Sequence, residues 1–198
     1  MKRAIIFILL IFYYCNSFSQ SFYADSINNF IKNYVETHEV VTGDDRKLLH
    51  FYPANEKYHV IARFEKVENG KWFSMETSGR TKQVYRVYGT LYFAINDTAV
   101  KLNLYQSQNL MTIEKYKNHL FLPFTDLTSG EETYDNGRYI DLETGDIKNK
   151  TVEIDFNKAY NPYCAYVSNT YNCPIPPKEN YLPVAILAGE KNYGKSSH

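Results

Sequence analysis

The sequence has no excess charge of either sign, since 22 lysine and arginine residues balance 22 aspartate and glutamate residues. Proteins whose main partner is nucleic acid need surplus basic residues to neutralise phosphates, so this balance argues against nucleic acid. The signature motifs of P-loop and dinucleotide-binding proteins, zinc proteases, serine hydrolases, CxxC proteins and EF-hands are also missing from the sequence. The sequence therefore names no reaction, cofactor, metal or oligomeric state.

The sequence also lacks an apolar run long enough to span a membrane. Residues 4–14 are uncharged and almost wholly apolar, but these 11 residues are too few for a bilayer core of about 30 Å. Lys2 and Arg3 precede the run, and the small residues at either end of 17–19 suit a signal peptidase site. This layout predicts a signal peptide over residues 1–20 and an exported protein, either periplasmic or extracellular.

Cysteine is scarce, with three residues in the chain. Cys15 follows the apolar run, where a bacterial lipoprotein carries its acylated cysteine, but bulky Tyr13 and Tyr14 precede it. We therefore favour loss of Cys15 with the signal peptide and keep lipid anchoring through Cys15 as the alternative. In an exported protein the remaining pair, Cys164 and Cys173, predicts a disulfide. The alternative is a metal or redox pair, which neither CxxC spacing nor histidine spacing supports.

The first segment after the signal peptide predicts a helix. The composition, 44% hydrophobic and 22% charged, is that of a globular protein, and the length fits one domain. Over residues 25–36 the apolar positions follow the i, i+3, i+4, i+7, i+8 stripe of an amphipathic helix, with Asp25 as the expected N-cap. The stripe consists of Ile27, Phe30, Ile31, Tyr34 and Val35. We expect it to pack on the domain.

From Pro53 onward the hydrophobic period changes to two, which is the pattern of half-buried strands. Asn69-Gly70 and Asn96-Asp97 predict tight turns, the first being a strong hairpin signal, and Gly89 predicts a bend or bulge. Strands are expected near 60–65, 72–77, 82–95, 100–104, 119–124, 138–142, 151–156 and 183–188. The fold class is therefore mainly β: an antiparallel meander forming a barrel or sandwich, with a short N-terminal helix and long irregular C-terminal loops. We expect one domain over residues 21–193 and a disordered tail over 194–198.

Residues 121–191 are rich in tyrosine, asparagine, aspartate, proline and glycine. Long polar and aromatic loops on a β scaffold are frequent binding sites, and tyrosine combines an apolar ring with a polar tip. Such a surface suits a small molecule, a sugar or a peptide; alternatively, the tyrosines only cover one end of the barrel. The residues we expect to bind a ligand are Tyr134, Arg138, Tyr139, Tyr160, Asn161 and Tyr166.

The same region holds the candidates for chemistry. Two carboxylates facing each other could act as general acid and base, and the catalytic candidates are Asp126, Asp141 and Asp155. Arg138 could clamp an anionic group, or it could pair with Asp141 or Asp155 and hold the loops together. The structural alternative for the acidic residues is turn and cap formation, because Thr128 and Glu131 have capping-box spacing. The wider acidic set also includes Glu132 and Glu190.

Two stretches carry a resemblance to a known family: FLPFTDLTSGEETYDNGRYIDL and IDFNKAYNPYCAYVSNTYNCPIPPKENYLPVAILAGEK. They resemble the uncharacterised bacterial family catalogued as domain of unknown function 1684, and the segment YPANEKYHVIARFE fits its first strand. Leu187 departs from the pattern, because family members often have a basic residue there. The resemblance implies membership and no activity.

Three hypotheses follow for function. The first is an exported cell-envelope module that binds a small ligand or has a structural role. The second is a hydrolase that uses Asp126, Asp141 or Asp155 with Arg138. The third is a metal or redox site at Cys164 and Cys173. Binding predicts carboxylates that are individually engaged in hydrogen bonds, hydrolysis predicts two of them converging with Arg138 in a pocket, and metal binding predicts free sulfur atoms.

Overall fold

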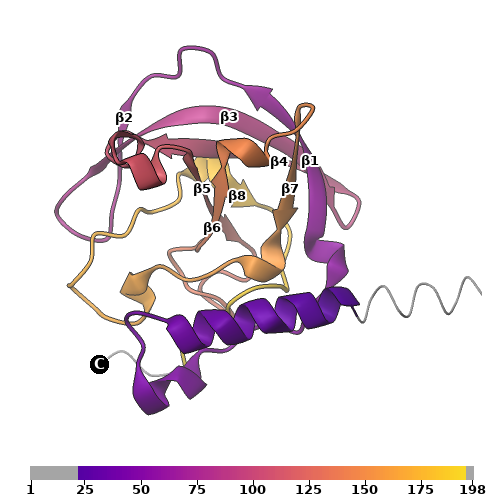
Figure 1. Cartoon of the computed structure of the whole chain (residues 1–198), viewed down its shortest axis with the longest axis vertical. Helices are drawn as coiled ribbons and strands as arrows, with labels where there is room; N and C mark the ends of the chain where they lie inside the picture. Colours follow the sequence, from indigo (N-terminus) through magenta and orange to yellow (C-terminus); the bar gives the residue numbers. More distant parts are fainter. Residues whose placement is uncertain (1–21, 195–198) are drawn as a thin grey trace, which may run out of the picture.

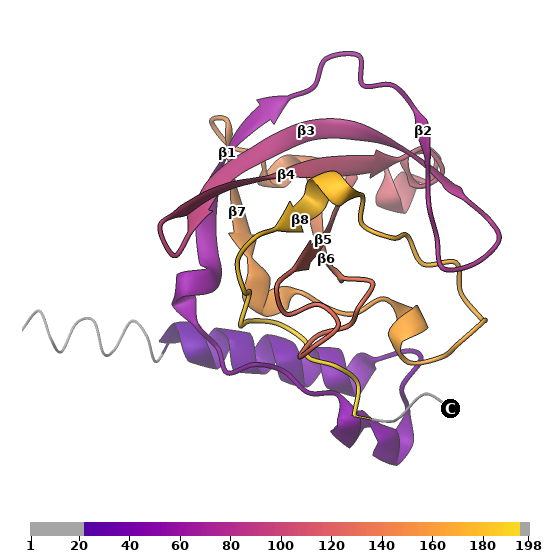
Figure 2. The same ribbon diagram turned by 180° about the vertical axis from the view of Figure 1, so that it is seen from behind.

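Eight strands form one strongly curved sheet that wraps into a half barrel (Figures 1 and 2). The structure, a computed structural model, describes residues 22–194, so the expected signal peptide over 1–20 and residues 195–198 of the expected tail lie outside it. The strands are β1 (His59–Lys66), β2 (Phe73–Met75), β3 (Gln83–Ile95), β4 (Thr98–Ser107), β5 (His119–Asp126), β6 (Arg138–Glu143), β7 (Thr151–Asp155) and β8 (Tyr181–Leu182). The predicted fold class, mainly β with an antiparallel meander, is confirmed.

The sheet order is β6-β5-β4-β3-β1-β7, with β2 added to β3 and β8 added to β5. The strands pair antiparallel except β8, which runs parallel to β5. β6 and β7 are therefore the two end strands of the half barrel. Short 3-10 helices occupy the connections: η1 (Gly43–Leu48), η2 (Glu56–Tyr58), η3 (Leu110–Thr112), η4 (Glu114–Tyr116), η5 (Thr144–Asp146), η6 (Phe156–Lys158), η7 (Tyr163–Ala165) and η8 (Lys178–Asn180).

The period-two pattern places one face of each long strand in the core. In β1, Ala62 and Phe64 are buried while Arg63 is exposed. The main core consists of buried side chains from β1 and from β3 to β8, joined by Phe156, Ile186 and Ala188. A second cluster, built from aromatic residues and one methionine, joins β2 to β6: Met75, Tyr85, Tyr105, Phe121 and Tyr139.

Two turn predictions are confirmed in detail. Asn96 and Asp97 both have positive φ and close the β3–β4 hairpin, a conformation that asparagine and aspartate tolerate. The register of this hairpin shifts between Val87 and Gly89, which is the expected bulge. Asn69 also turns with positive φ, but β1 and β2 both pair with β3 and not with each other, so the hairpin expected there is wrong.

The N-terminal helix is present, and residues 22–37 are helical. Asp25 therefore lies within the helix, and its predicted N-cap role is wrong. Ile27 is buried, and the helix lies across one end of the half barrel (Figure 1). Within residues 22–194, no helix combines the length and the apolar character needed to cross a membrane.

The strand predicted over 183–188 is wrong, because pairing stops at Leu182. Ile186 and Ala188 are nevertheless fully buried. Their carbonyl oxygens accept hydrogen bonds from the Arg138 guanidinium instead of from a neighbouring strand. A buried segment needs partners for its backbone groups, and here one side chain supplies them.

Candidate functional site

A cleft of about 1130 Å³ lies at the two end strands of the sheet. Its walls come from β6, β7, the N-terminal helix and the loop that follows η7. Its lining includes Phe30, Tyr34, His38, Glu39, His59, Tyr139, Asp141, Asp146, Lys148, Glu153, Asp155, Lys158, Tyr160, Tyr163, Tyr171 and Cys173. Small-molecule sites typically measure about 300–1,000 Å³, so the cleft has room for such a ligand or for an extended one.

Aromatic rings run along the cleft in contact with each other. The ring centroids of Tyr34 and Tyr160 lie 6.1 Å apart, and those of Tyr160 and Tyr139 lie 5.9 Å apart at nearly a right angle. The ring centroids of Tyr163 and Tyr171, which also line the cleft, lie 5.1 Å apart. The Tyr160–Tyr139 and Tyr163–Tyr171 contacts are edge-to-face and the Tyr34–Tyr160 contact is tilted. Ring contacts of these kinds fix ring positions, so the cleft has a preformed aromatic wall.

Among the predicted catalytic candidates, Asp141 has the most exposed side chain, and it lies in the cleft lining. Its Oδ1 lies 2.8 Å from Nε2 of His119, and its Oδ2 accepts a 2.7 Å hydrogen bond from the Tyr160 hydroxyl. Burial and the nearby Asp141 charge hold the pKa of Tyr160 well above its ordinary value, so the hydroxyl stays a donor. The Asp141 side chain remains 49% exposed, and a carboxylate accepts about four hydrogen bonds, which leaves capacity for a ligand.

Asp155 also lines the cleft, but its Oδ1 is occupied. It accepts hydrogen bonds from the Asn157 backbone at 3.1 Å, the Asn157 side chain at 2.9 Å and the Tyr23 hydroxyl at 2.9 Å. Asp155 thus caps η6 and fastens the N-terminal helix to the end of β7.

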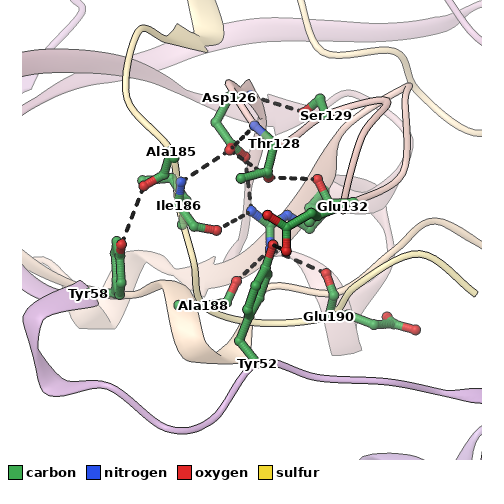
Figure 3. Close-up of polar contacts among 12 residues, drawn as sticks. Tyr52, Tyr58, Asp126, Thr128, Ser129, Glu132, Ala185, Ile186, Ala188 and Glu190 are labelled. Atoms are coloured by element: carbon green, nitrogen blue, oxygen red, sulfur yellow. Dashed lines mark hydrogen bonds and ion pairs between the residues drawn. The ribbon is translucent and has the colours of Figure 1, made fainter.

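Arg138 and Asp126 form a separate, fully buried site, and neither residue lines the cleft. Figure 3 shows Asp126 with its partners Thr128 and Ile186. One guanidinium nitrogen lies 2.9 Å from Asp126 Oδ2 and 3.0 Å from the Ile186 carbonyl. The other donates to the carbonyls of Ala188 and Glu190. We expected Arg138 to pair with Asp141 or Asp155 if it was structural; its partner is Asp126.

Asp126 is equally occupied. Its Oδ1 accepts from the backbone and hydroxyl of Thr128, at 2.9 and 2.7 Å, and from the Ile186 backbone at 3.1 Å. The first of these bonds is the Asx turn expected from the sequence. Neither Asp126 nor Arg138 has an exposed side chain, so a ligand in the cleft does not reach them.

A third polar cluster surrounds Glu190, whose residue has no exposed surface. The Glu190 carboxylate accepts hydrogen bonds from the Tyr166 hydroxyl at 2.8 Å, the Asn161 backbone at 2.8 Å and the Tyr34 hydroxyl at 3.3 Å. Burial raises the pKa of Glu190 to about 7. Tyr166 and Asn161, predicted to bind a ligand, thus engage a buried acid of the protein itself.

The six residues predicted to bind a ligand are therefore not brought together. Tyr139 and Tyr160 line the cleft. Arg138, Asn161 and Tyr166 belong to the buried clusters described above. The last of the six, Tyr134, accepts a hydrogen bond from Asn136 outside the cleft.

Cys164 and Cys173 lie at disulfide-bonding distance, with 2.07 Å between the sulfur atoms. The loop that they close contributes Tyr171 and Cys173 to the cleft wall. Among residues 22–194, no group of three or more histidine, cysteine or acidic side chains is placed to hold a metal ion. The metal hypothesis required free sulfur atoms, and here the two sulfurs are joined to each other.

Sequence reasoning missed the contribution of the N-terminal helix to the cleft. Phe30 and Tyr34 were assigned to core packing from their helical spacing, yet both are half-buried and line the cleft. His38 and His59, which no pattern in the sequence singled out, also line the cleft. The available signal was that two residues of the stripe, Phe30 and Tyr34, are aromatic.

The fold and the site together define a half-barrel β domain with an aromatic, carboxylate-bearing cleft at its end strands. The chain belongs to the family described as Protein of unknown function (DUF1684), which matches residues 46–191. It is also similar to an uncharacterised protein of Haloarcula marismortui with a solution NMR structure, at 28% identity and a TM-score of 0.64. That similarity covers 89% of this chain and 97% of the other. Comparison with curated proteins gives no match.

Proposed function

We propose that this protein is a binding module. Its ligand, a small organic molecule or a segment of an extended one such as a peptide, occupies the cleft at β6 and β7. The supporting observation is the combination of volume, aromatic wall and half-exposed Asp141 in one cleft. Ligand sites are typically concave and largely apolar, with a few polar groups that fix orientation. A sugar or a peptide has that mixed character.

Binding is favoured over hydrolysis by the way the carboxylates are used. The hydrolase hypothesis needs Arg138 and two carboxylates in one pocket, whereas Arg138 is buried with Asp126. Asp155 is held by three hydrogen bonds to its Oδ1. Of the three predicted catalytic candidates, Asp141 alone combines a place in the cleft lining with an exposed side chain, and one such carboxylate can orient a ligand but supplies no acid–base pair by itself.

A pair of matched tyrosine variants tests this proposal. Tyr171 is 38% exposed and lines the cleft, whereas Tyr181 is 46% exposed and lies on β8. Sugars, short peptides and amines are titrated into labelled protein, and amide chemical shifts are followed by NMR. We expect shifts to cluster on β6, β7 and the loop after η7. Tyr171→Ala should weaken binding about tenfold through loss of a stacking face, and Tyr181→Ala should leave it unchanged.

Equal effects of the two substitutions, or shifts that cluster away from the cleft, would refute the proposal. The unfolding midpoint of each variant is measured alongside, so that a general loss of structure is recognised.

We propose further that the protein is exported. Lys2, Arg3 and the apolar run over residues 4–14 support this, and the bonded pair Cys164 and Cys173 is compatible with an oxidising compartment. Intact mass of protein secreted by its host, measured without reductant, should show a chain beginning near Gln20 with both thiols resistant to alkylation. A full-length chain in which Cys164 and Cys173 are both free thiols would contradict export, and added acyl mass at Cys15 would identify a lipid anchor.

A further inference from the structure

The cleft has a charge that the molecule as a whole does not have. Five carboxylates line it, against the two lysines Lys148 and Lys158, with histidine counted as neutral. The whole chain is balanced, with formal net charge +0. The carboxylates are Glu39, Asp141, Asp146, Glu153 and Asp155. The cleft is therefore a local region of negative potential, which attracts cations and disfavours anions.

The aromatic wall adds a second attraction for cations. Ring faces are electron-rich, and a cation within about 6 Å of a ring centroid is stabilised by them, most strongly when water is excluded. Tyr160 is in contact with the ring of Tyr34 and donates its hydroxyl to Asp141. An ammonium group beside Asp141 would meet a carboxylate and these rings together.

A lysine of the cleft lining already contacts both an aromatic ring and a carboxylate. The Nζ of Lys158 lies 5.9 Å from the ring centroid of Phe30 and 3.9 Å from the Asp155 carboxylate. A cation is thus close to both an aromatic ring and an acid in the same cleft. At Asp141 the acid and the rings are present, and Asp141 forms its bonds to uncharged Tyr160 and to His119.

From this geometry we infer that the cleft selects an organic cation carrying an alkylammonium group, with Asp141 as its charge partner and the tyrosine rings against its carbon chain. This inference deepens the binding function proposed above and rests on it. The ammonium group can belong to a free amine or to a lysine side chain of a peptide. The chemistry at Asp141 is the same for both sources.

Matched probes test the inference. Cadaverine is compared with the uncharged diol of the same carbon chain, and an N-acetylated, C-amidated Gly-Lys-Gly peptide is compared with its glutamine counterpart. Affinities are measured by calorimetry on the secreted protein, and the binding site of each probe is located on it by NMR. We expect the charged member of each pair to bind at least about tenfold more tightly, and added salt to weaken only that member.

Asp141→Asn removes the charge and keeps the shape of the side chain. It should reduce the affinity for the charged probes about tenfold or more and leave the uncharged probes unaffected. Glu68→Gln removes the same charge from an exposed residue outside the cleft lining and should have no effect. Thermal unfolding of both variants controls for folding.

The outcomes separate the two proposals. Sugars or diols that bind in the cleft as well as the amines do would overturn the cation inference and leave the binding function standing. Retained affinity in Asp141→Asn would also overturn it. Binding of no probe would overturn both proposals. Much tighter binding of the lysine peptide than of cadaverine would support the inference with a peptide as the source of the ammonium group.

Discussion

Arg138 carries a full charge into the core, where neither it nor Asp126 has exposed surface. Its guanidinium also supplies the hydrogen bonds that the Ile186 and Ala188 carbonyls would otherwise lack. Removing one member of a buried ion pair leaves an uncompensated charge and typically costs about 3–5 kcal/mol. We therefore expect Arg138→Met to lower the free energy of unfolding by about that amount, measured by urea denaturation.

Arg63→Met is the control, because Arg63 pairs with Glu65 on the exposed side of β1 and its side chain is 57% exposed. Exposed pairs contribute about 0–1 kcal/mol, so this variant should remain close to the parent protein. A loss in Arg138→Met no larger than in Arg63→Met would show that the buried pair is not structural.

The sequence singled out Arg138 and Asp126 but could not place them. Whether an arginine faces a ligand or the core depends on which backbone groups lie around it, and those groups come from the segment 186–190. No local pattern in the sequence around Arg138 indicates that the segment 186–190 will pack against it. The same limitation explains why Tyr166 and Asn161 were expected to face a ligand and instead surround Glu190.

At the scale of elements, Gly89 lies at the bulge of β3, where the strand packs closely against β1. A side chain at Gly89 would overlap the ring of Phe64 and come within 2.8 Å of the Glu65 carbonyl oxygen. Overpacking of this kind typically costs about 1–3 kcal/mol, so Gly89→Ala should lower the free energy of unfolding by a similar amount.

Gly145→Ala is the matched control, since an added methyl group there has no atom within 4 Å and the backbone is not left-handed. Its effect should lie within about 0.5 kcal/mol of the parent. The two variants are compared in the same denaturation experiment, and equal effects would mean that the Gly89 position can relax.

Strands were predictable from the sequence where burial alternates, as in β1 and β3, because period two is a local property. The segment 183–188 was not predictable, because its apolar residues are buried without a partner strand. The helix over 22–37 was predictable as an element, but its role in the cleft depends on Tyr34 meeting Tyr160, far along the chain.

At the scale of the whole molecule, Glu190 joins three distant parts of the chain. Tyr34 reaches it from the N-terminal helix, Tyr166 and Asn161 reach it from the loop around η7, and Glu190 itself follows the C-terminal apolar segment. The helix and the cleft wall thus depend on one buried acid. Because burial raises the pKa of Glu190 to about 7, folding favours its protonated form.

The raised pKa of Glu190 makes the free energy of unfolding depend on pH, and the direction of the pKa shift sets the sign of that dependence. The ordinary pKa of the group is 4.5, so between about pH 4.5 and 7 the folded protein holds a proton that the unfolded chain releases. The contribution of Glu190 to stability therefore falls as pH rises through this window, by about 3 kcal/mol in total, and is constant above it. The contribution of His38 to stability changes with pH in the opposite direction, because burial and the Arg46 charge lower the pKa of His38.

The difference between the parent protein and Glu190→Gln isolates this contribution, because His38 and the other titrating groups are common to both. We expect the free energy of unfolding of the parent, minus that of the variant, to decrease steadily from pH 4.5 to 7 and then to level off. The difference between the parent and Glu68→Gln should stay flat, since Glu68 is exposed. A flat difference for Glu190→Gln as well would mean that Glu190 titrates near its ordinary pKa, and that the Tyr34 and Tyr166 hydroxyls stabilise a charged carboxylate at the junction of helix and cleft.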